Sequence, residues 1–474
     1  MGEIADVVGG GTPRTNDPEN YEGGTIPWIT PADLSGYTAK NISHGERLIT
    51  TKGLVGSSAK MMPSGTVLFS SRAPVGYVAI AANPVCTNQG FKSFVLKTKD
   101  ILPDYIYWWL KGSKDLAESL ASGTTFLELS GAKAKQLPIP LAPPGQQQSI
   151  VAEIEKQFSR LDEAVANLKR VKVNLKRYKA AVLKGAVEGK LTEDWRKQHP
   201  NVEPASKLLE RILSERQAKW SGEGRYKEPE APDVIGLPSL PKSWTWARLE
   251  QLGVTFGGLT KNPKRAKLAN KLPYLRVANV YANELRLNEI EHIGVHDFEL
   301  NKLLVRKGDL LVVEGNGSKG QIGRLAIWDG SIDPCVHQNH LIKVRLVFGV
   351  MNKWILFWLL SPVGRHFIEE VSSSTSGLYT LSANKVGALP IIVPSLVEQE
   401  QIIAEVERRL SVIEELESTV QANLTRADRL RQAVLRNAFT GNLLAHIKHQ
   451  EEGLNITSSS EASECHENPF FRSS

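Results

Sequence analysis

Two stretches of the chain match each other and decide its fold. Residues 137–155 read LPIPLAPPGQQQSIVAEIE, and residues 389–407 read LPIIVPSLVEQEQIIAEVE. The offset between them, 389 minus 137, is 252 positions, and it aligns 137–191 with 389–443 without a gap. The chain is therefore a tandem duplication in which each copy contains the same start of a long helix.

The duplication continues upstream of these helices. The segment CTNQGF at 86–91 aligns with CVHQNH at 335–340, among short β-type runs such as TVLFSS and DLLVVE. Each copy also has an amphipathic helical segment, near 103–121 and 350–371. These patterns predict an α+β fold with two tandem globular domains of mixed short strands and helices, each followed by a long helix.

Composition shifts along the 474 residues set the expected domain boundaries. Prolines surround one short charged helix in the segment between the copies, and the C-terminal tail is polar and rich in Ser and Glu, which is typical of disorder. The expected parts are a first globular domain at 1–138, a first long helix at 145–191, a linker with a short helix at 195–243, a second globular domain at 244–390, a second long helix at 397–445 and a disordered tail at 446–474.

Both long helices carry apolar residues at seven-residue steps, the pattern of a coiled-coil seam. The seam positions are Ile154, Leu161, Leu168, Leu175 and Val182 in the first helix, and Val406, Ile413, Val420, Ala427 and Val434 in the second.

Charge predicts the direction in which the two helices pair. Residues 166–191 carry eight bases and one acid, a net charge of +7, whereas 397–417 carry seven acids and two arginines, a net charge of −5. Antiparallel pairing places these opposite charges together, so it is favoured over parallel pairing. Tandem copies whose helices pair in this way are expected to be related by a pseudo-two-fold axis.

Charge and composition also limit the class of function. The net charge of +7 and a pI of about 9.1 fit a polyanionic partner without proving one. Three cysteines and no apolar stretch near the roughly 20 residues that span a bilayer predict a cytoplasmic protein that does not enter a membrane. Cys86 and Cys335 occupy equivalent positions with no ligand partners nearby, so they are predicted to be buried framework residues.

Motifs that suggest catalysis are weak in this sequence. GNGSKG at 315–320 fits a Gly-rich phosphate loop, but its counterpart SRAPVG at 71–76 does not. Asp309 and Glu314 lack the lysine of a nuclease motif, and NPFF at 468–471 lacks the second proline of an adenine methyltransferase loop. We therefore predict no catalytic residue and no metal site.

Basic and amide side chains in the Gly-rich or polar loops are the candidates for contact with DNA, because Arg and Lys can bind guanine edges and Asn can bind adenine. The candidate DNA-binding residues are Arg72, Lys92, Arg276, Asn316, Lys319 and Arg324. For any one of them, a merely solvated side chain remains the alternative interpretation.

The repeated LPIP and LPII segments, the paired helix starts, AVLKGAVEGKLTEDWR at 181–196 and AVLRNAFTGNLL at 433–444 together resemble the DNA-specificity subunit of type I restriction-modification systems. The resemblance covers most of the chain. It implies a non-catalytic reader of an asymmetric bipartite target in double-stranded DNA. It also implies two modification subunits that methylate adenine with S-adenosylmethionine, and restriction subunits that use ATP and Mg. No cofactor is implied in this chain itself.

Two alternatives stay open from the sequence. One is a self-contained restriction or modification enzyme, which would need cofactor or carboxylate motifs. The other is a coiled-coil scaffold that does not read DNA.

Overall fold

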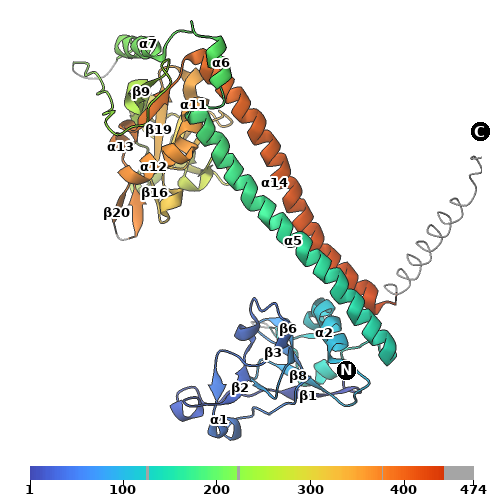
Figure 1. Cartoon of the computed structure of the whole chain (residues 1–474). Coiled ribbons are helices and arrows are strands. Elements are labelled where there is room, and N and C mark those ends of the chain that lie inside the picture. The colour runs from blue at the N-terminus through green and yellow to red at the C-terminus, as the bar shows by residue number, and fades with distance from the viewer. Residues whose placement is uncertain (124–126, 221–224, 376, 442–474) are drawn as a thin grey trace, which may run out of the picture. The chain divides into compact units, whose positions relative to one another are not determined.

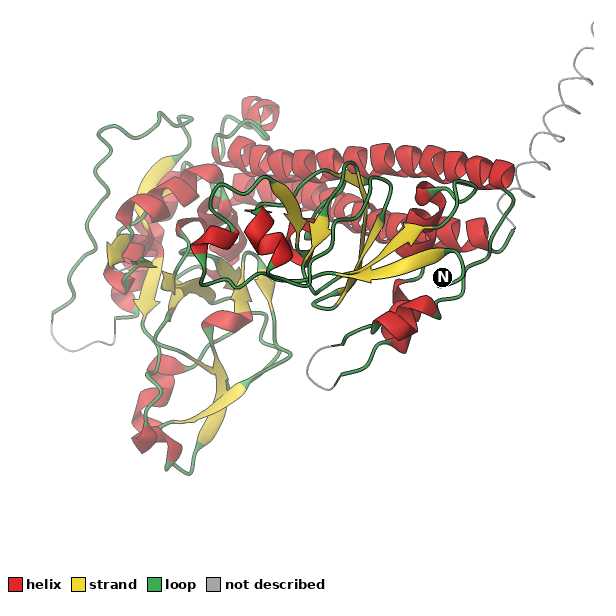
Figure 2. Ribbon diagram, turned by 90° about the horizontal axis from the view of Figure 1, so that it is seen from below, coloured by secondary structure: helices red, strands yellow, loops and turns green. Residues whose placement is uncertain are grey.

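A computed structural model describes residues 1–123, 127–220, 225–375 and 377–441, and the tail predicted at 446–474 lies outside them. The chain divides into two compact units. The first contains Met1–Lys169 together with the residues from Gln421 onward, and the second contains Arg170–Val420. Both units mix helices with strands (Figure 2), so the α+β class expected from the sequence is confirmed.

The first unit is built on a five-stranded sheet with the order β1-β8-β5-β6-β3. A second sheet of three short strands has the order β4-β2-β7. The strands are β1 (Ala5–Gly9), β2 (Ile26–Ile29), β3 (Asn41–Ile42), β4 (Leu48–Ile49), β5 (Val67–Ser71), β6 (Val75–Ala81), β7 (Cys86–Thr87) and β8 (Lys92–Leu96). The helices that precede the long one are α1 (Thr51–Val55), α2 (Pro103–Gly112), α3 (Lys114–Leu120) and α4 (Gly131–Lys135).

The second unit has a corresponding four-stranded sheet, β10-β19-β15-β17, and a three-stranded sheet, β14-β11-β18. In three additional small sheets, β12 pairs with β13, β21 pairs with both β16 and β20, and β22 pairs with β9. Its strands are β9 (Thr245–Arg248), β10 (Gly253–Phe256), β11 (Lys271–Leu275), β12 (Val280–Tyr281), β13 (Glu284–Leu285), β14 (Glu291–Gly294), β15 (Leu310–Val313), β16 (Gly315–Asn316), β17 (Leu325–Ile327), β18 (Val336–His337), β19 (Leu341–Leu346), β20 (Ser373–Thr375), β21 (Leu378–Thr380) and β22 (Pro390–Val393).

Short helices complete the second unit: α6 (Glu193–Gln198), α7 (Ala205–Ala218), α8 (Leu249–Leu252), α9 (Pro263–Ala266), α10 (Leu300–Leu303), α11 (Asn352–Leu360), α12 (Pro362–Val371) and α13 (Ala383–Gly387). Helices α6 and α7 lie in the segment expected to be a linker. Leu208 and Ile212 of α7 are fully buried, and α7 packs against α8 of the second unit. This part of the segment is therefore integrated into the second unit.

The amphipathic segment expected as one helix in each copy is interrupted in both. In the second copy, α11 ends at Leu360 and α12 begins at Pro362. Pro362 has no N–H and suits the first turn of a helix, and the Ser361 hydroxyl accepts a hydrogen bond from the Gly364 N–H at 3.1 Å. In the first copy the break falls at Ser113, between α2 and α3.

Equivalent contacts hold the two units together internally, even where the residues differ. In the first unit the Trp28 indole donates to the Gly11 carbonyl at 2.9 Å. In the second, the Tyr274 hydroxyl donates to the Leu259 carbonyl at 2.8 Å. Cys86 and Cys335 are fully buried, and burial raises the pKa of each thiol to about 12, so the prediction of framework cysteines is confirmed.

Two helices of 44 residues each dominate the helical content: α5 (Pro144–Val187) and α14 (Leu396–Phe439). In the first unit the beginning of α5 lies beside the end of α14 (Figure 1), with Ile150, Ile154, Leu435 and Ala438 in one core. In the second unit Leu183 near the end of α5 lines the same cavity as Leu410 of α14. The pairing is therefore antiparallel in both units, as the charge pattern predicts.

Burial follows the predicted seam. Seven of its ten members are buried: Ile154, Leu175, Val182, Val406, Ile413, Val420 and Ala427. The other three, Leu161, Leu168 and Val434, are half-buried. Within the described ranges, none of the helices combines the length and apolar character that crossing a membrane requires.

Candidate nucleic-acid interface and helix lock

Opposite charges meet across the two long helices in the first unit. In the first unit Arg431 forms an ion pair with Asp162, and its guanidinium lies 5.6 Å from the centre of the Phe158 ring. In the second unit, the described residues include no ion pair within 4.0 Å between Lys176 or Lys179 and the acids of α14. In the second unit, buried seam residues such as Leu175, Val182 and Ile413 therefore supply the described contact between the helices.

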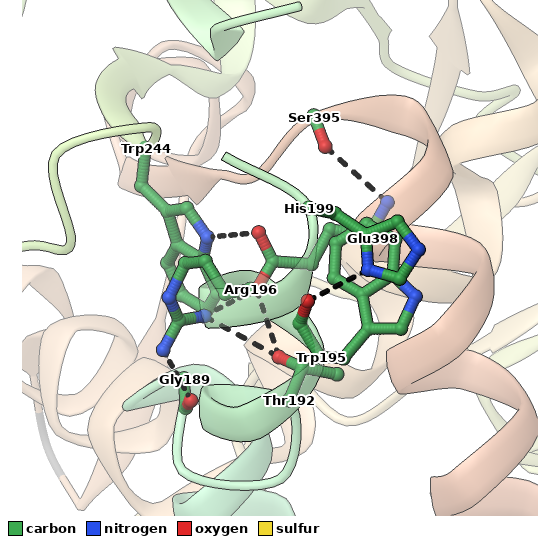
Figure 3. Close-up of polar contacts among 8 residues, drawn as sticks. All are labelled: Gly189, Thr192, Trp195, Arg196, His199, Trp244, Ser395 and Glu398. Atoms are coloured by element: carbon green, nitrogen blue, oxygen red, sulfur yellow. Dashed lines mark hydrogen bonds and ion pairs between the residues drawn. The ribbon is translucent and has the colours of Figure 1, made fainter. Parts of the chain in front are cut away.

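A buried polar cluster of the second unit is centred on Glu398, in the first turn of α14 (Figure 3). Its carboxylate is 1% exposed and accepts hydrogen bonds from the Thr192 hydroxyl and the Trp244 indole, both at 2.8 Å. It also forms an ion pair with Arg196. We call Gly189, Thr192, Arg196, Trp244 and Glu398 the helix lock.

The second half of the helix lock fixes the turn after α5. The Arg196 guanidinium donates to the Gly189 carbonyl at 2.7 Å and lies 5.4 Å from the Trp244 ring (Figure 3). Gly189 has φ of +72°, and a Cβ there would lie 3.1 Å from Trp244 and 3.2 Å from Arg196, so glycine fits the close approach. One buried carboxylate thus joins the start of α14 to Thr192 and Arg196 at helix α6 and to Trp244, which directly precedes β9.

Sequence reasoning missed this role, because it counted Glu398 only as one of the acids that set the charge of the second helix. One signal was available. Glu398 is aligned with Gln146, so the charge exists in one copy and is absent from the other.

Four of the six candidate DNA-binding residues are engaged with other protein groups. Arg72 and Lys92 lie 3.6 Å and 3.9 Å from the carboxylate of Glu128. Arg276 forms an ion pair with Glu291 at 2.7 Å. The structure therefore brings Arg72 and Lys92 together in the first unit, at a shared acid.

Arg324 is the fourth engaged residue. It donates to the Val277 carbonyl at 3.0 Å, and its guanidinium lies 4.4 Å from the Tyr281 ring, which also stacks with Arg286 at 3.7 Å. Arg324 further lines a cavity with Lys176 and Lys179 of α5. Arg324 therefore lies next to the long helix α5.

Asn316 and Lys319 lie in the segment that follows β15. Asn316 lies in β16, which pairs with β21, and its side-chain oxygen accepts from the Ser318 N–H at 2.9 Å. Lys319 is exposed and has no ion pair among the described residues. Of the five charged candidates, Arg72, Lys92 and Arg276 lie in ion pairs and Arg324 is held by a backbone carbonyl and an aromatic ring, whereas Lys319 is exposed.

No group of three or more His, Cys, Asp or Glu side chains in the described ranges is placed to hold a metal ion. Taken together, the fold and the site define a class: a duplicated protein with two mixed domains, each joined to one helix of an antiparallel pair.

Comparison with known proteins shows what the chain resembles. Residues 1–175 match the model of the type I restriction modification DNA specificity domain. The chain is 43% identical over 171 residues to the type I restriction enzyme MjaIX specificity subunit of Methanocaldococcus jannaschii, which covers 35% of this chain and 38% of that protein. It is 26% identical over 433 residues to the EcoKI specificity subunit of Escherichia coli, covering 88% and 84%.

Solved structures agree in fold. One, reported as the structural basis of complex assembly and conformational transition of the type I R-M system, has a TM-score of 0.65 at 18% identity and covers 93% of this chain and 97% of its own. The HsdS subunit from Thermoanaerobacter tengcongensis has a TM-score of 0.51 at 16% identity, covering 93% and 96%. The chain is thus similar, over most of its length, to specificity subunits of type I restriction enzymes, and residues 1–175 match the model of their DNA specificity domain.

Proposed function

We propose that this chain is the sequence-reading subunit of a type I restriction-modification complex and that it recognises an asymmetric, bipartite target in double-stranded DNA. The observation that carries the proposal is the internal duplication combined with antiparallel pairing of α5 and α14. Duplex DNA has pseudo-two-fold symmetry, and paired reading heads contact two half-sites at a fixed spacing. Because the loops of the two copies have diverged, their half-sites differ.

In this proposal, residues 1–138 and 244–390 are the two recognition domains, and the long helices set the distance between the half-sites. The helix lock joins the second domain to the long helices, and Leu183 of α5 and Leu410 of α14 line one cavity. A protein that recognises two half-sites at a fixed spacing requires such a connection, because mobile recognition domains would accept half-sites at variable spacing.

The partners of the chain follow from the same proposal. Two modification subunits dock on it and methylate adenine, one on each strand, and restriction subunits complete the complex. S-adenosylmethionine, ATP and Mg belong to those subunits, and this chain holds no cofactor. The location is cytoplasmic, where the DNA of the cell is accessible.

Among the candidate contacts, Lys319 and Asn316 are the first choice for direct interaction with DNA. They lie in one loop of the second domain, and an exposed lysine can bind a phosphate or a guanine edge. Arg72, Lys92, Arg276 and Arg324 would have to exchange their protein partners for DNA, and the ion pairs with Glu128 and Glu291 hold three of them in place until then.

The experiment is methylome sequencing of cells that carry the complete system, with and without this chain. The expected result is methylated adenine at one asymmetric bipartite motif, which disappears when the chain is deleted. A motif that persists without the chain would contradict the proposal. A complex that assembles but methylates no defined motif would favour the coiled-coil scaffold instead.

A further inference from the structure

The second unit contains a cavity of about 380 Å³ beside the long helix α5. Clefts that bind small ligands have volumes of about 300–1,000 Å³. Four cations line this cavity: Lys176 and Lys179 of α5, Arg324, which directly precedes β17, and Arg365 of α12. None of the described residues that line it is acidic. We call the cavity and these four side chains the cation pocket.

The cation pocket also has an apolar wall. Leu183 of α5, Phe357 of α11 and Leu410 of α14 line it, and all three side chains are buried. Polar atoms placed against these side chains would lose their hydrogen bonds to water. A ligand that fits the cation pocket therefore carries an apolar surface as well as a negative charge.

The cations of the pocket lack full partners among the described residues. Lys176 and Lys179 form no ion pair there with the acids of α14. Nε of Arg324 and Nη2 of Arg365 are buried without a hydrogen-bond partner. The Glu369 carboxylate lies 3.7 Å from Arg365 Nη2, which is too long for a hydrogen bond. Buried donors without acceptors are costly, and an anionic ligand would supply the acceptors that these groups lack.

The duplication provides an internal comparison, because the first unit has larger side chains at the equivalent positions of the apolar wall. The aligned motifs YIYWWL and WILFWL match Trp108 with Phe357, and the 252-residue offset matches Phe158 with Leu410. In the first unit the rings of Trp108 and Phe158 pack edge to face, with their centres 5.0 Å apart. In the second unit the smaller Phe357 and Leu410 both line the cavity.

Charge differs between the two copies at the same place. Lys179 aligns with Arg431, which forms an ion pair with Asp162 in the first unit. Asp162 aligns with Glu414, but Glu414 lines a neighbouring cavity and forms no ion pair with Lys179 within the described ranges. The cation that is neutralised in the first unit is therefore left without its acid in the second.

We propose that the cation pocket binds a small organic phosphate. Its phosphate group accepts hydrogen bonds from the lysine and arginine side chains, whose geometry and charge suit phosphate oxygens. Its apolar body packs against Phe357 and Leu410. The bound molecule contacts α5, α11, α12 and α14 together and so holds the second domain on the long helices.

This binding is independent of the recognition of DNA. A backbone phosphate of DNA is flanked by sugars and is bound by cations on an open surface. It gains nothing from an apolar wall, and the Arg365 side chain is only 19% exposed. An apolar cavity with a largely buried guanidinium thus favours a small ligand over the DNA backbone.

The test is a calorimetric titration of the full chain with phenyl phosphate, which joins an apolar ring to a phosphate group. Saturable one-to-one binding is expected. Inorganic phosphate, which lacks the ring, and phenol, which lacks the charge, should each bind at least about tenfold more weakly.

Variants of the chain locate the ligand. Arg365→Gln and Lys179→Gln should each weaken binding of phenyl phosphate at least about tenfold, because each removes a charged donor. Lys264→Gln, at an exposed lysine of α9, is the matched control and should bind like the parent chain. Phe357→Trp combined with Leu410→Phe installs the side chains of the first unit and should abolish binding by filling the cavity. Circular dichroism of each variant distinguishes lost binding from lost folding.

Three outcomes would overturn the proposal. The first is the absence of saturable binding of phenyl phosphate. The second is equal binding by the parent chain and by folded Arg365→Gln and Lys179→Gln chains, which would mean an adventitious surface contact only. The third is displacement of phenyl phosphate by duplex DNA together with weaker DNA binding by these two variants in gel shifts, which would assign the cavity to the DNA backbone.

Discussion

Removal of the Glu398 carboxylate tests the helix lock most severely. Glu398→Ala leaves the Arg196 guanidinium without its anion and the Trp244 indole and Thr192 hydroxyl without their acceptor. Breaking a buried ion pair by removing one partner costs about 3–5 kcal/mol. Because the Arg196 side chain is 20% exposed and regains some water, we expect a loss of about 3 kcal/mol in the free energy of unfolding of the second unit.

The measurement combines chemical denaturation with amide hydrogen exchange, which assigns the loss to particular segments. Faster exchange is expected in α6, β9 and the first turns of α14. The matched control is Gln146→Ala, at the aligned and exposed position of the first copy, where a change within about 0.5 kcal/mol is expected. Equal effects of the two substitutions would refute the reasoning that the buried carboxylate stabilises the junction.

Three other predictions address contact with DNA, pH and helix charge. If Lys319 contacts a base, Lys319→Ala in the assembled complex should weaken binding of the cognate DNA by about 1–3 kcal/mol in a gel-shift titration. Lys307→Ala is the control. Unchanged affinity of the Lys319→Ala complex would exclude this contact. Burial, followed by the charge of Lys343, lowers the pKa of His337 from 6.5 to about 4. The folded state therefore binds fewer protons than the unfolded state, and stability should fall by about 1.4 kcal/mol per pH unit from pH 6.5 down to about 4. His337→Asn should flatten the dependence of the unfolding free energy on pH, measured from denaturation curves at several pH values. An unchanged pH dependence would contradict the role of His337. Replacing Lys176 and Lys179 with Glu should lower the free energy of unfolding by less than about 1 kcal/mol, because neither lysine forms an ion pair with the described acids of α14. Adding Glu414→Lys and Glu417→Lys should restore part of that loss. If these two substitutions restore nothing, the loss does not arise from charge.

The elements that the sequence predicts best are those with a repeated signal. The seam from Ile154 to Val182 and its counterpart from Val406 to Val434 could be found, because a seven-residue period is visible without any knowledge of tertiary contacts. The direction of pairing followed from the two blocks of opposite charge. The burial of Cys86 and Cys335 followed from their equivalence in the two copies.

The features that sequence reasoning missed depend on contacts between distant segments. Glu398 is buried because Thr192, Arg196 and Trp244 converge on it from other parts of the chain, and no local pattern shows this convergence. The ion pairs of Arg72 with Glu128 and of Arg276 with Glu291 likewise join residues from different strands and loops. Residue type alone indicates that these arginines can bind DNA, and only the structure gives their present partners.

The most direct test of the central claim, that two separable reading heads share one helical spacer, is methylome sequencing of a domain chimera. Residues 244–390 are replaced with the corresponding segment of a relative, and the methylated motif is compared with that of the parent system. The account predicts that one half-site changes while the other half-site and the spacer length stay the same. A change in both half-sites, or a change in spacer length, would contradict it.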